Sequence, residues 1–397
     1  MNPVAITGVG VVCGLGADLD QVSRGLQRNE VGHLSDDSSL LRSAIVPRHA
    51  PETPKGFEDD RKVAWLMSAV KGATKDEESG PSDRKGVFLG TGLSSVTPRE
   101  LEQDVYPHVC SGRIERASVM RDLGADGVAP WRHMPERATA EVARIWGATG
   151  PILTAFSACA AGAEAIAEAA RSIARGEIDV ALAGAHDAMA HPLGMLSFQV
   201  LGAMSATTGR PFDRRRDGFV LGEGAAVLRL ERAEFAREPL GYILGAGSSI
   251  DAWGVTAPHP EGAGAELSMK RALADAGLTA DQVDWVNAHA TGTPVGDRAE
   301  AQAIARVFGS DVPVSSLKGA LGHVLAAAGA VEAAATLAGL RDGFIPGTVG
   351  CEELDNMNID VVMESRKHPI KIALSNSFGF GGQNCSLVMA SASWGER

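Results

Sequence analysis

Short apolar runs alternate with longer alanine-rich or amphipathic stretches along the chain. The apolar runs are bounded by glycine and rich in β-branched residues, and they predict strands at Val4–Gly8, Gly86–Gly92, Val180–Gly184, Ala225–Leu230, Gly241–Ile250, Val283–His289, Val312–Leu317 and Ile370–Ser375. Helical periodicity predicts helices at Cys159–Arg175, Glu266–Ala276, Arg298–Phe308 and Val324–Arg341. Continuously apolar strands indicate sheets covered on both faces, and their alternation with helices is typical of an α/β protein.

Both halves of the chain open with a strand that leads into glycine-rich sequence, at Ala5–Gly10 and at Ile243–Gly247. This similarity is a faint sign of internal duplication. The pattern is interrupted near residues 235–240, so we predict two domains, residues 1–237 and residues 238–397.

Composition narrows the class of protein. The chain has 397 residues, 45% of them hydrophobic and 22% charged, which is enough to bury a sizeable core. A net charge of −12 repels phosphate backbones and argues against a nucleic-acid partner. The five cysteines form no CxxC pair, which disfavours a disulfide framework or a metal site. No signal-peptide pattern and no membrane-length apolar run is visible, so we expect a cytoplasmic protein without a membrane partner.

Cys159 lies in a stretch of small residues, Phe156–Gly162 (FSACAAG), between a β-like run at Ile152 and Leu153 and a long predicted helix. A tight turn at this point would direct the free N–H groups of the helix start toward the thiol and stabilise its thiolate, the nucleophilic form. Small neighbours would also let a substrate carbonyl approach the backbone. The alternative is a buried cysteine that packs as a small hydrophobe.

Two histidines also follow predicted strands. His289 opens a loop of small and hydroxyl-bearing residues (HATGTP), after which Asp297 is expected to cap a helix with Glu300 in a capping box. His323 follows a glycine-punctuated loop and is predicted at a helix N-terminus, where a neutral imidazole is favoured. Glu332 faces away from His323 on that helix and is expected to pair with a basic side chain such as Lys318.

A loop of three glycines around two phenylalanines follows the last predicted strand. It comprises Phe378, Gly379, Phe380, Gly381 and Gly382. Glycine gives such a loop freedom to move and the phenylalanines give it bulk, which is typical of a lid over an apolar pocket. The alternative is an ordinary turn with two core aromatics.

The order of these motifs is more specific than any one of them. The chain has, in this order, a cysteine at a helix start, a histidine with Thr-Gly-Thr, a lysine five residues before a second histidine, and a Gly-Phe-Gly-Gly loop. This order resembles the elongating β-ketoacyl-[acyl-carrier-protein] synthases of type II fatty acid and polyketide assembly, within the thiolase superfamily. The stretch Pro211–Ala225 (PFDRRRDGFVLGEGA) is similar to a further signature of that family. The resemblance extends from about Val4 to Met389.

This resemblance implies a duplicated five-layer αβαβα fold and a decarboxylative Claisen condensation. Cys159 would hold the acyl group, and His289 and His323 would stabilise the enolate that malonyl-acyl carrier protein forms on losing CO2. The backbone N–H groups of Cys159 and Phe380 would form the oxyanion hole. The partners implied are acyl carrier protein and a second copy of the chain, or a chain-length-factor-like subunit. No metal or dissociable cofactor is implied, because phosphopantetheine arrives on the carrier protein.

Further positions match supporting roles in the family. Thr291 and Thr293 match residues that bind the phosphopantetheine arm, and Lys318 and Glu332 match a pair that organises His323. Phe380 matches a gatekeeper within the gating loop 378–382. Asp297 and Glu300 are expected to support the loop that carries His289.

The sequence also departs from the family pattern. Ala290 replaces a glycine, and Leu317 and Leu321 replace residues that are commonly threonine, changes that are expected to reshape the pantetheine tunnel or acyl pocket. The segment 93–148, which includes Trp131, His133 and Trp146, matches poorly and suggests a specialised polyketide or polyene substrate. Together with segment 50–85, it is expected to decorate the core or cap it.

Related classes remain as alternatives. A chain-length factor lacks the nucleophilic cysteine, and an initiating condensing enzyme would have asparagine in place of His323. A degradative thiolase needs a second catalytic cysteine near the C-terminus, where Cys385 lies in a strand-like run and is interpreted as a core residue. A binding or scaffold protein would leave the ordered catalytic motifs without a role.

Overall fold

A computed structural model of the chain describes residues 1–34, 44–49, 51–57, 60–75, 84–92, 106–122 and 134–395. Within this described part, no helix is long and apolar enough to cross a membrane.

Eleven strands form one mixed sheet that runs through the whole molecule. In spatial order they are β12 (Asp360–Val361), β10 (Pro313–Ser315), β9 (Trp285–Asn287), β14 (Ile372–Gly379), β15 (Gln383–Ser391), β8 (Gly241–Ile250), β1 (Val4–Val12), β7 (Gly224–Arg232), β6 (Val180–Asp187), β2 (Lys85–Thr91) and β5 (Ile152–Ala155). Two small antiparallel sheets of two strands each pair β11 (Phe344–Ile345) with β13 (Arg366–Lys367) and β3 (Val109–Cys110) with β4 (Arg113–Ile114).

The same pairing pattern occurs twice in the large sheet. β1 is antiparallel to β7 and β7 to β6, after which β6, β2 and β5 are parallel. In the other half β8 is antiparallel to β15 and β15 to β14, after which β14, β9 and β10 are parallel. β1 also pairs with β8 and joins the halves. The faint sequence repeat therefore has a counterpart in strand topology, while the exact boundary at 237/238 stays a prediction.

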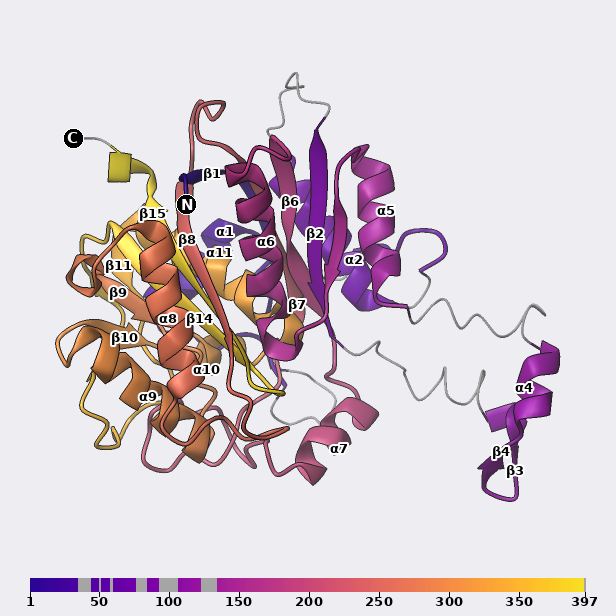
Figure 1. Ribbon diagram of the computed structural model, residues 1–397. Helices are drawn as coiled ribbons and strands as arrows, with labels where there is room; N and C mark the ends of the chain where they lie inside the picture. The colour runs from indigo at the N-terminus through magenta and orange to yellow at the C-terminus, as the bar shows by residue number, and fades with distance from the viewer. Residues whose placement is uncertain are drawn as a thin grey trace.

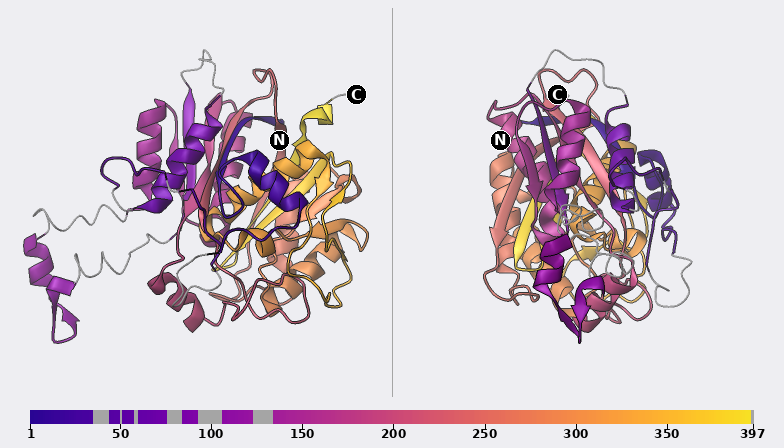
Figure 2. Two further views of the ribbon diagram at one scale, coloured as in Figure 1. Left: turned by 180° about the vertical axis from the view of Figure 1, so that it is seen from behind. Right: turned by 90° about the vertical axis from the view of Figure 1, so that its right-hand side faces the viewer.

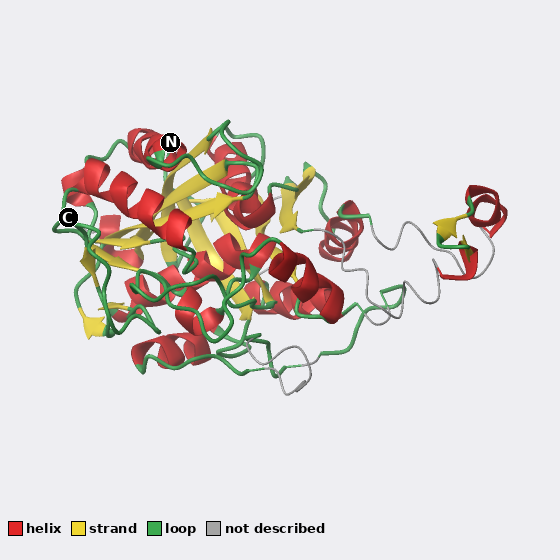
Figure 3. Ribbon diagram, turned by 90° about the horizontal axis from the view of Figure 1, so that it is seen from below, coloured by secondary structure: helices red, strands yellow, loops and turns green. Residues whose placement is uncertain are grey.

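Helices form three layers around the two halves of the sheet (Figure 1). The central helices α6 (Ala161–Ala174) and α11 (Ala328–Asp342) contact strands of both halves. One outer face is covered by α2 (Arg61–Ala73) and α5 (Glu136–Trp146), and the other by α8 (Ala263–Ala276) and α9 (Pro294–Phe308). Figure 3 shows strands enclosed by helices on either side. This is the five-layer arrangement that the resemblance implied.

The alanine-rich composition of the central layer follows from its packing. Every residue of α11 from Ala328 to Leu340 is buried. A Cβ on Gly162 of α6 would lie 2.8 Å from the backbone nitrogen of Ala330, so only small residues let the two helices approach this closely. The close contact places the start of α6 against the turn that precedes α11.

Several predicted boundaries are wrong. α6 begins at Ala161 after a 3₁₀ turn at Ala158–Ala160, and α11 begins at Ala328 after a 3₁₀ turn at Leu325–Ala327. His323 therefore precedes a 3₁₀ turn rather than the helix itself. α9 begins at Pro294 with Thr293 as its N-cap, so Asp297 lies inside the helix and the predicted capping box is absent there.

Segment 50–85 is not merely a decoration, because its helix α2 covers strands β1 and β7 and buries Trp65 and Leu66. In segment 93–148, β3, β4 and α4 (Arg116–Asp122) project from the body (Figure 2). Trp131 and His133 lie outside the described residues. The remaining helices are α1 (Leu19–Gln27), α7 (Pro192–Val200) and α10 (Lys318–Leu321).

Candidate active site

Cys159 lies in the 3₁₀ turn between β5 and α6 and is buried, with 7% of its surface exposed. The preceding residue Ala158 has a φ of 47°, in the left-handed region that costs a non-glycine residue energy and is concentrated at functional sites. The backbone N–H groups of Cys159 and Phe380 are directed at the Cys159 thiol and lower its pKa. The sulfur therefore faces two N–H donors, one from its own 3₁₀ turn and one from the turn between β14 and β15, rather than the helix-start N–H groups that the sequence predicts.

Two imidazoles complete the centre. Nε2 of His323 lies 3.1 Å from Sγ of Cys159. The His289 ring lies 5.3 Å from the His323 ring between centroids, at an interplanar angle of 82°. An aromatic ring packs against each histidine: Phe219 lies edge-on to His323, and the ring of Phe378 is tilted relative to that of His289. The structure thus brings together three residues that are separated by up to 164 positions in the chain.

Burial decides the charge state of these groups. It lowers the pKa of both His289 and His323 well below the usual value, and the positive charge of Lys318 lowers it further. Burial also raises the pKa of the Cys159 thiol to about 12, against the lowering effects of Lys318 and the two N–H groups. The resting site is therefore a neutral thiol beside neutral imidazoles, because desolvation of the thiol outweighs the N–H donors that favour its thiolate.

This charge state predicts a specific pH profile for alkylation. In a Cys110→Ser background, which removes the exposed cysteine, iodoacetamide modification of Cys159 should accelerate about tenfold per pH unit across pH 7–9. The reason is that only the small thiolate fraction reacts. The rate is measured by mass spectrometry of the Cys159 peptide, with Cys159→Ala as the blank. A plateau below pH 8 would contradict the buried neutral thiol.

Lys318 and Glu332 form a buried ion pair beneath the histidines. Lys318 begins α10 and its Nζ lies 2.5 Å from Oε1 of Glu332 on α11, with both side chains at most 2% exposed. Burial raises the pKa of Glu332, and the positive charge of Lys318 lowers it. The pairing predicted from the sequence is confirmed, whereas its role in organising His323 stays a prediction.

Breaking this pair should destabilise the fold. Lys318→Met leaves Glu332 buried without its cation, and we expect a loss of about 3–5 kcal/mol in the free energy of unfolding. Urea denaturation monitored by circular dichroism measures the loss.

The double variant Lys318→Met/Glu332→Leu provides the control, because it removes both charges and should recover a substantial part of the stability. Exposed ion pairs contribute about 1 kcal/mol or less. If the free energy of unfolding of Lys318→Met were within about 1 kcal/mol of the parent, the pair would not be isolated from water.

Two carboxylates hold the loop that carries His289. Glu300 accepts the backbone N–H groups of His289 at 2.8 Å and Ala290 at 2.7 Å. Asp297 accepts those of Gly292 at 3.0 Å and Phe212 at 2.8 Å. Burial raises the pKa of Glu300 to about 7 and that of Asp297 to about 6, despite these donors. The support predicted for both residues is present, although not as a helix cap.

A cavity of about 290 Å³ opens at the three central residues. Its walls include Thr291 and Thr293, whose hydroxyl groups lie 3.0 Å apart, and Ala290. Leu317 and Leu321 are fully buried in the core and do not line this cavity, so their effect on the tunnel or the acyl pocket stays a prediction. Within the described residues, no cluster of His, Cys, Asp or Glu is arranged to hold a metal ion.

The predicted gating loop forms the turn between β14 and β15. Phe378 and Gly379 end β14, and Gly381 and Gly382 take φ values of 84° and 76° that favour glycine. Phe380 and Gly379 line the cavity beside Cys159. A Cβ on Gly379 would lie 3.1 Å from the backbone nitrogen of Cys159. Glycine thus allows this turn to pack directly on the nucleophile turn, while its movement stays a prediction.

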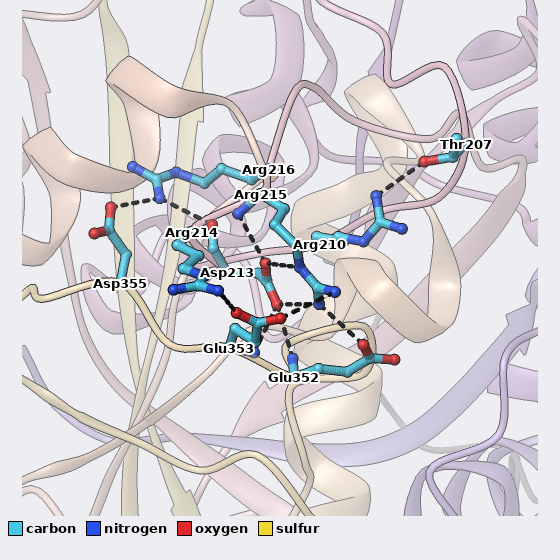
Figure 4. Close-up of polar contacts among 9 residues, drawn as sticks. All are labelled: Thr207, Arg210, Asp213, Arg214, Arg215, Arg216, Glu352, Glu353 and Asp355. Atoms are coloured by element: carbon cyan, nitrogen blue, oxygen red, sulfur yellow. Dashed lines mark hydrogen bonds and ion pairs between the residues drawn. The ribbon is translucent and has the colours of Figure 1, made fainter.

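An ion-pair cluster in the Pro211–Ala225 signature was not assigned a role from the sequence. Figure 4 shows Arg215 paired with Asp213 inside this signature. The contacts Arg214–Glu353, Arg215–Glu352 and Arg216–Asp355 join the signature to an acidic loop. Arg216 also donates to the backbone oxygen of Pro294 at 3.0 Å, next to Thr293. The cluster therefore fixes the start of α9 at the cavity wall. Only the run of five charged residues from Asp213 to Asp217 signalled the cluster in the sequence.

Cys385 does not join the site. It lies in β15 opposite Ser377 and Ser248, is fully buried, and does not line the cavity. Burial raises its pKa well above the usual value. This position supports its interpretation as a core residue and disfavours a second catalytic cysteine.

Comparisons with known proteins agree with the geometry. Residues 1–236 match the family described as "Beta-ketoacyl synthase, N-terminal domain" and residues 240–352 match "Beta-ketoacyl synthase, C-terminal domain". The chain therefore belongs to the β-ketoacyl synthase family and has its thiolase-like fold. More particularly, it is a 3-oxoacyl-[acyl-carrier-protein] synthase, an acyltransferase that forms a carbon–carbon bond in fatty acid or polyketide elongation.

Individual relatives support this assignment. The chloroplastic 3-oxoacyl-[acyl-carrier-protein] synthase II of Arabidopsis thaliana is 42% identical, over 98% of this chain and 75% of the relative. The 3-oxoacyl-[acyl-carrier-protein] synthase 2 of Mycobacterium bovis is 34% identical, over 97% of this chain and 96% of the relative. A β-ketoacyl synthase structure from Burkholderia phymatum is 32% identical over 98% of this chain and 100% of that chain, with a TM-score of 0.83.

A solved ketosynthase of a type II polyketide system, in complex with its acyl-carrier protein and bound to a hexaketide, superposes with a TM-score of 0.86 at 26% identity, over 98% of this chain and 99% of that chain. A ketosynthase from Xenorhabdus doucetiae in complex with its chain length factor has a TM-score of 0.85 at 27% identity, over 98% of each chain.

Proposed function

We propose that Cys159 is the nucleophile that takes the acyl group from acyl carrier protein. Its sulfur attacks the thioester carbonyl, the bond to the pantetheine sulfur breaks, and that sulfur leaves with the thiol proton. Nε2 of His323, 3.1 Å from Sγ, relays the proton. A relay is needed because the thiol is neutral at rest. This short contact is the observation that carries the proposal.

In the second half-reaction, malonyl-acyl carrier protein enters and loses CO2. His289 and His323 donate from Nε2 to the thioester oxygen, where the negative charge of the enolate develops. Both imidazoles are neutral because burial lowers their pKa, so each carries one hydrogen to donate. The first half-reaction needs a lone pair on Nε2 of His323 and the second needs a hydrogen there, so this ring changes tautomer between them.

The enolate carbon then attacks the acyl group on Cys159. The carbonyl oxygen becomes an oxyanion that accepts the backbone N–H groups of Cys159 and Phe380, the same donors that face the resting thiol. Collapse releases the β-ketoacyl-carrier protein and the Cys159 thiolate, which takes up a proton. Thr291 and Thr293 hold the phosphopantetheine arm along the cavity wall, and no metal or dissociable cofactor takes part.

The test is intact mass of the protein after incubation with acyl-carrier proteins that bear different chains. We expect a mass gain equal to the acyl group, lost on hydroxylamine treatment that cleaves thioesters. A protein that takes up no acyl group from any donor, alone or with a partner subunit, would contradict the proposal.

For the substrate, we propose a specialised polyketide or polyene chain rather than an ordinary saturated fatty acyl chain. The support is the poor match of segment 93–148 and the likeness to a ketosynthase bound to a hexaketide. Competition between saturated and polyenoic acyl-carrier proteins, read from the mass of the acylated enzyme, tests the preference. Equal loading of both classes would overturn it.

We also propose that the chain works as a homodimer, or as the active member of a heterodimer with a chain-length-factor-like subunit, in the cytoplasm. The edge strand β5 leaves one side without a partner within the described residues. Exposed apolar side chains lie on it and on α7: Ile152 is 54%, Leu196 55% and Val200 80% exposed. Such surfaces are typical of interfaces. Light scattering of the purified chain gives the mass that distinguishes monomer from dimer.

A further inference from the structure

Asp187 is a buried carboxylate that ends strand β6 and takes no part in the mechanism above. It is 2% exposed. Oδ1 accepts the backbone N–H of Ala188 at 2.9 Å, and Oδ2 accepts that of Ala326 at 3.1 Å. The second bond crosses 139 positions of sequence and reaches the 3₁₀ turn that follows His323.

That turn is fixed at both ends. At its start, the backbone N–H of His323 donates to Val220 at 2.7 Å and its carbonyl accepts from Gly222 at 2.9 Å. Between them Leu325 adopts a φ of 49°, which costs a β-carbon-bearing residue roughly 1–3 kcal/mol and persists only where surrounding bonds impose it. At the other end of the turn, Ala326 donates its backbone N–H to Asp187. Among the described residues, Asp187 is the one side chain that hydrogen-bonds this end of the turn.

The turn also rests on the nucleophile helix. A Cβ on Gly162 would lie 3.1 Å from the carbonyl oxygen of Ala326, so any shift of the turn is transmitted to the start of α6. The separation between Nε2 of His323 and Sγ of Cys159 therefore depends on where Asp187 holds Ala326.

The charge of Asp187 provides a second connection between this residue and Cys159. The negative charge of Asp187 raises the pKa of the Cys159 thiol, in the direction of burial. Burial likewise raises the pKa of Asp187 to about 6, and the charged groups that act on it are Lys62 and Asp60 next to α2. Asp187 in turn raises the pKa of Glu223, and Lys62 lowers that of the neighbouring His186. Asp187 is therefore linked to the thiol by its charge as well as by its hydrogen bond to the turn that follows His323.

We propose that Asp187 is a positioning residue that holds the His323 turn within hydrogen-bonding distance of Cys159 and restrains the reactivity of its thiol. The proposal rests on the roles proposed above for Cys159 and His323. It assigns two separable effects to one carboxylate, a geometric one through Ala326 and an electrostatic one on the sulfur.

Two variants separate these effects. Asp187→Asn keeps one oxygen that can accept from Ala326, while it removes the charge and the acceptor for the N–H of Ala188. Asp187→Ala removes the charge and both acceptors. Iodoacetamide modification of Cys159 at pH 8, in the Cys110→Ser background, should be at least about threefold faster in Asp187→Asn, because a lower thiol pKa gives more thiolate. Acyl transfer should fall at least about tenfold in Asp187→Ala and by less than about threefold in Asp187→Asn.

Glu223→Gln is the matched control. It neutralises a buried carboxylate nearby that accepts the N–H of Ala190 and not that of Ala326, so it should leave both rates unchanged. A purely structural role for Asp187 would slow acyl transfer without shifting the alkylation profile, and that result overturns the proposal.

Equal alkylation rates in the parent and Asp187→Asn overturn it as well, and this comparison alone decides if Asp187→Ala does not fold. Alkylation requires only a reactive thiol. Failure of the parent to accept any acyl group would therefore count against the proposed function and not against the role of Asp187.

Discussion

Cys159→Ala is expected to abolish acyl loading and to lower condensation by at least about 10³-fold, because the covalent intermediate can no longer form. Decarboxylation of malonyl-acyl carrier protein should persist, since the enolate is stabilised by His289 and His323 and neither imidazole is removed. The two activities are measured side by side, loading by intact mass and decarboxylation by release of CO2.

Cys385→Ala supplies the matched control for this result. Cys385 is another buried thiol, but it lies in β15 away from the cavity lining, so its replacement should preserve acyl loading and cost only stability. Loading that survives in Cys159→Ala and disappears in Cys385→Ala would reverse the assignment of the nucleophile.

His289→Ala should lower decarboxylation and condensation by about 10²–10³-fold, because it removes one of two donors from the oxygen on which charge develops. Acyl loading of Cys159 should change far less, since Nε2 of His323 is the imidazole nitrogen at 3.1 Å from the thiol. Single-turnover assays resolve the two half-reactions. His323→Ala, by contrast, should impair both, because this imidazole is proposed to act in each.

His368→Ala is a suitable control for a general effect of losing a histidine, because His368 is not among the residues that line the cavity. If His289→Ala slowed loading as much as condensation, the separate assignment of the two histidines would be untenable.

The residues of the centre could be predicted because each follows a strand. Cys159 comes after β5, His289 after β9 and His323 after β10, and Phe378 lies near the end of β14. The carboxyl ends of parallel strands meet at one edge of a sheet, where α/β proteins place their sites. Local apolar runs identified these strands, so the sequence predicts which residues converge even without their distances.

What could not be predicted depends on long-range contacts or on unusual backbone angles. Asp187 reaches Ala326 and Arg216 reaches Pro294 across 139 and 78 positions, and no local spacing signals such pairs. The starts of α6 and α11 were placed too early because Ala158 and Leu325 adopt left-handed angles that alanine and leucine give no reason to expect. The charge state of the Cys159 thiol cannot be inferred from the sequence for a related reason, since the depth of burial is a property of the assembled fold.

The position of β1 has a consequence for biosynthesis. This strand leaves the ribosome long before its partners, because it pairs with β7, which begins at Gly224, and with β8, which begins at Gly241. At synthesis rates of about 5–20 residues per second, the segment Val4–Val12 waits roughly 10–40 s for its first partner. An apolar strand left unpaired for that time is a target for aggregation and for chaperones. Yield in a recombinant host should therefore respond to chaperone supply during translation more than to the final stability of the folded enzyme.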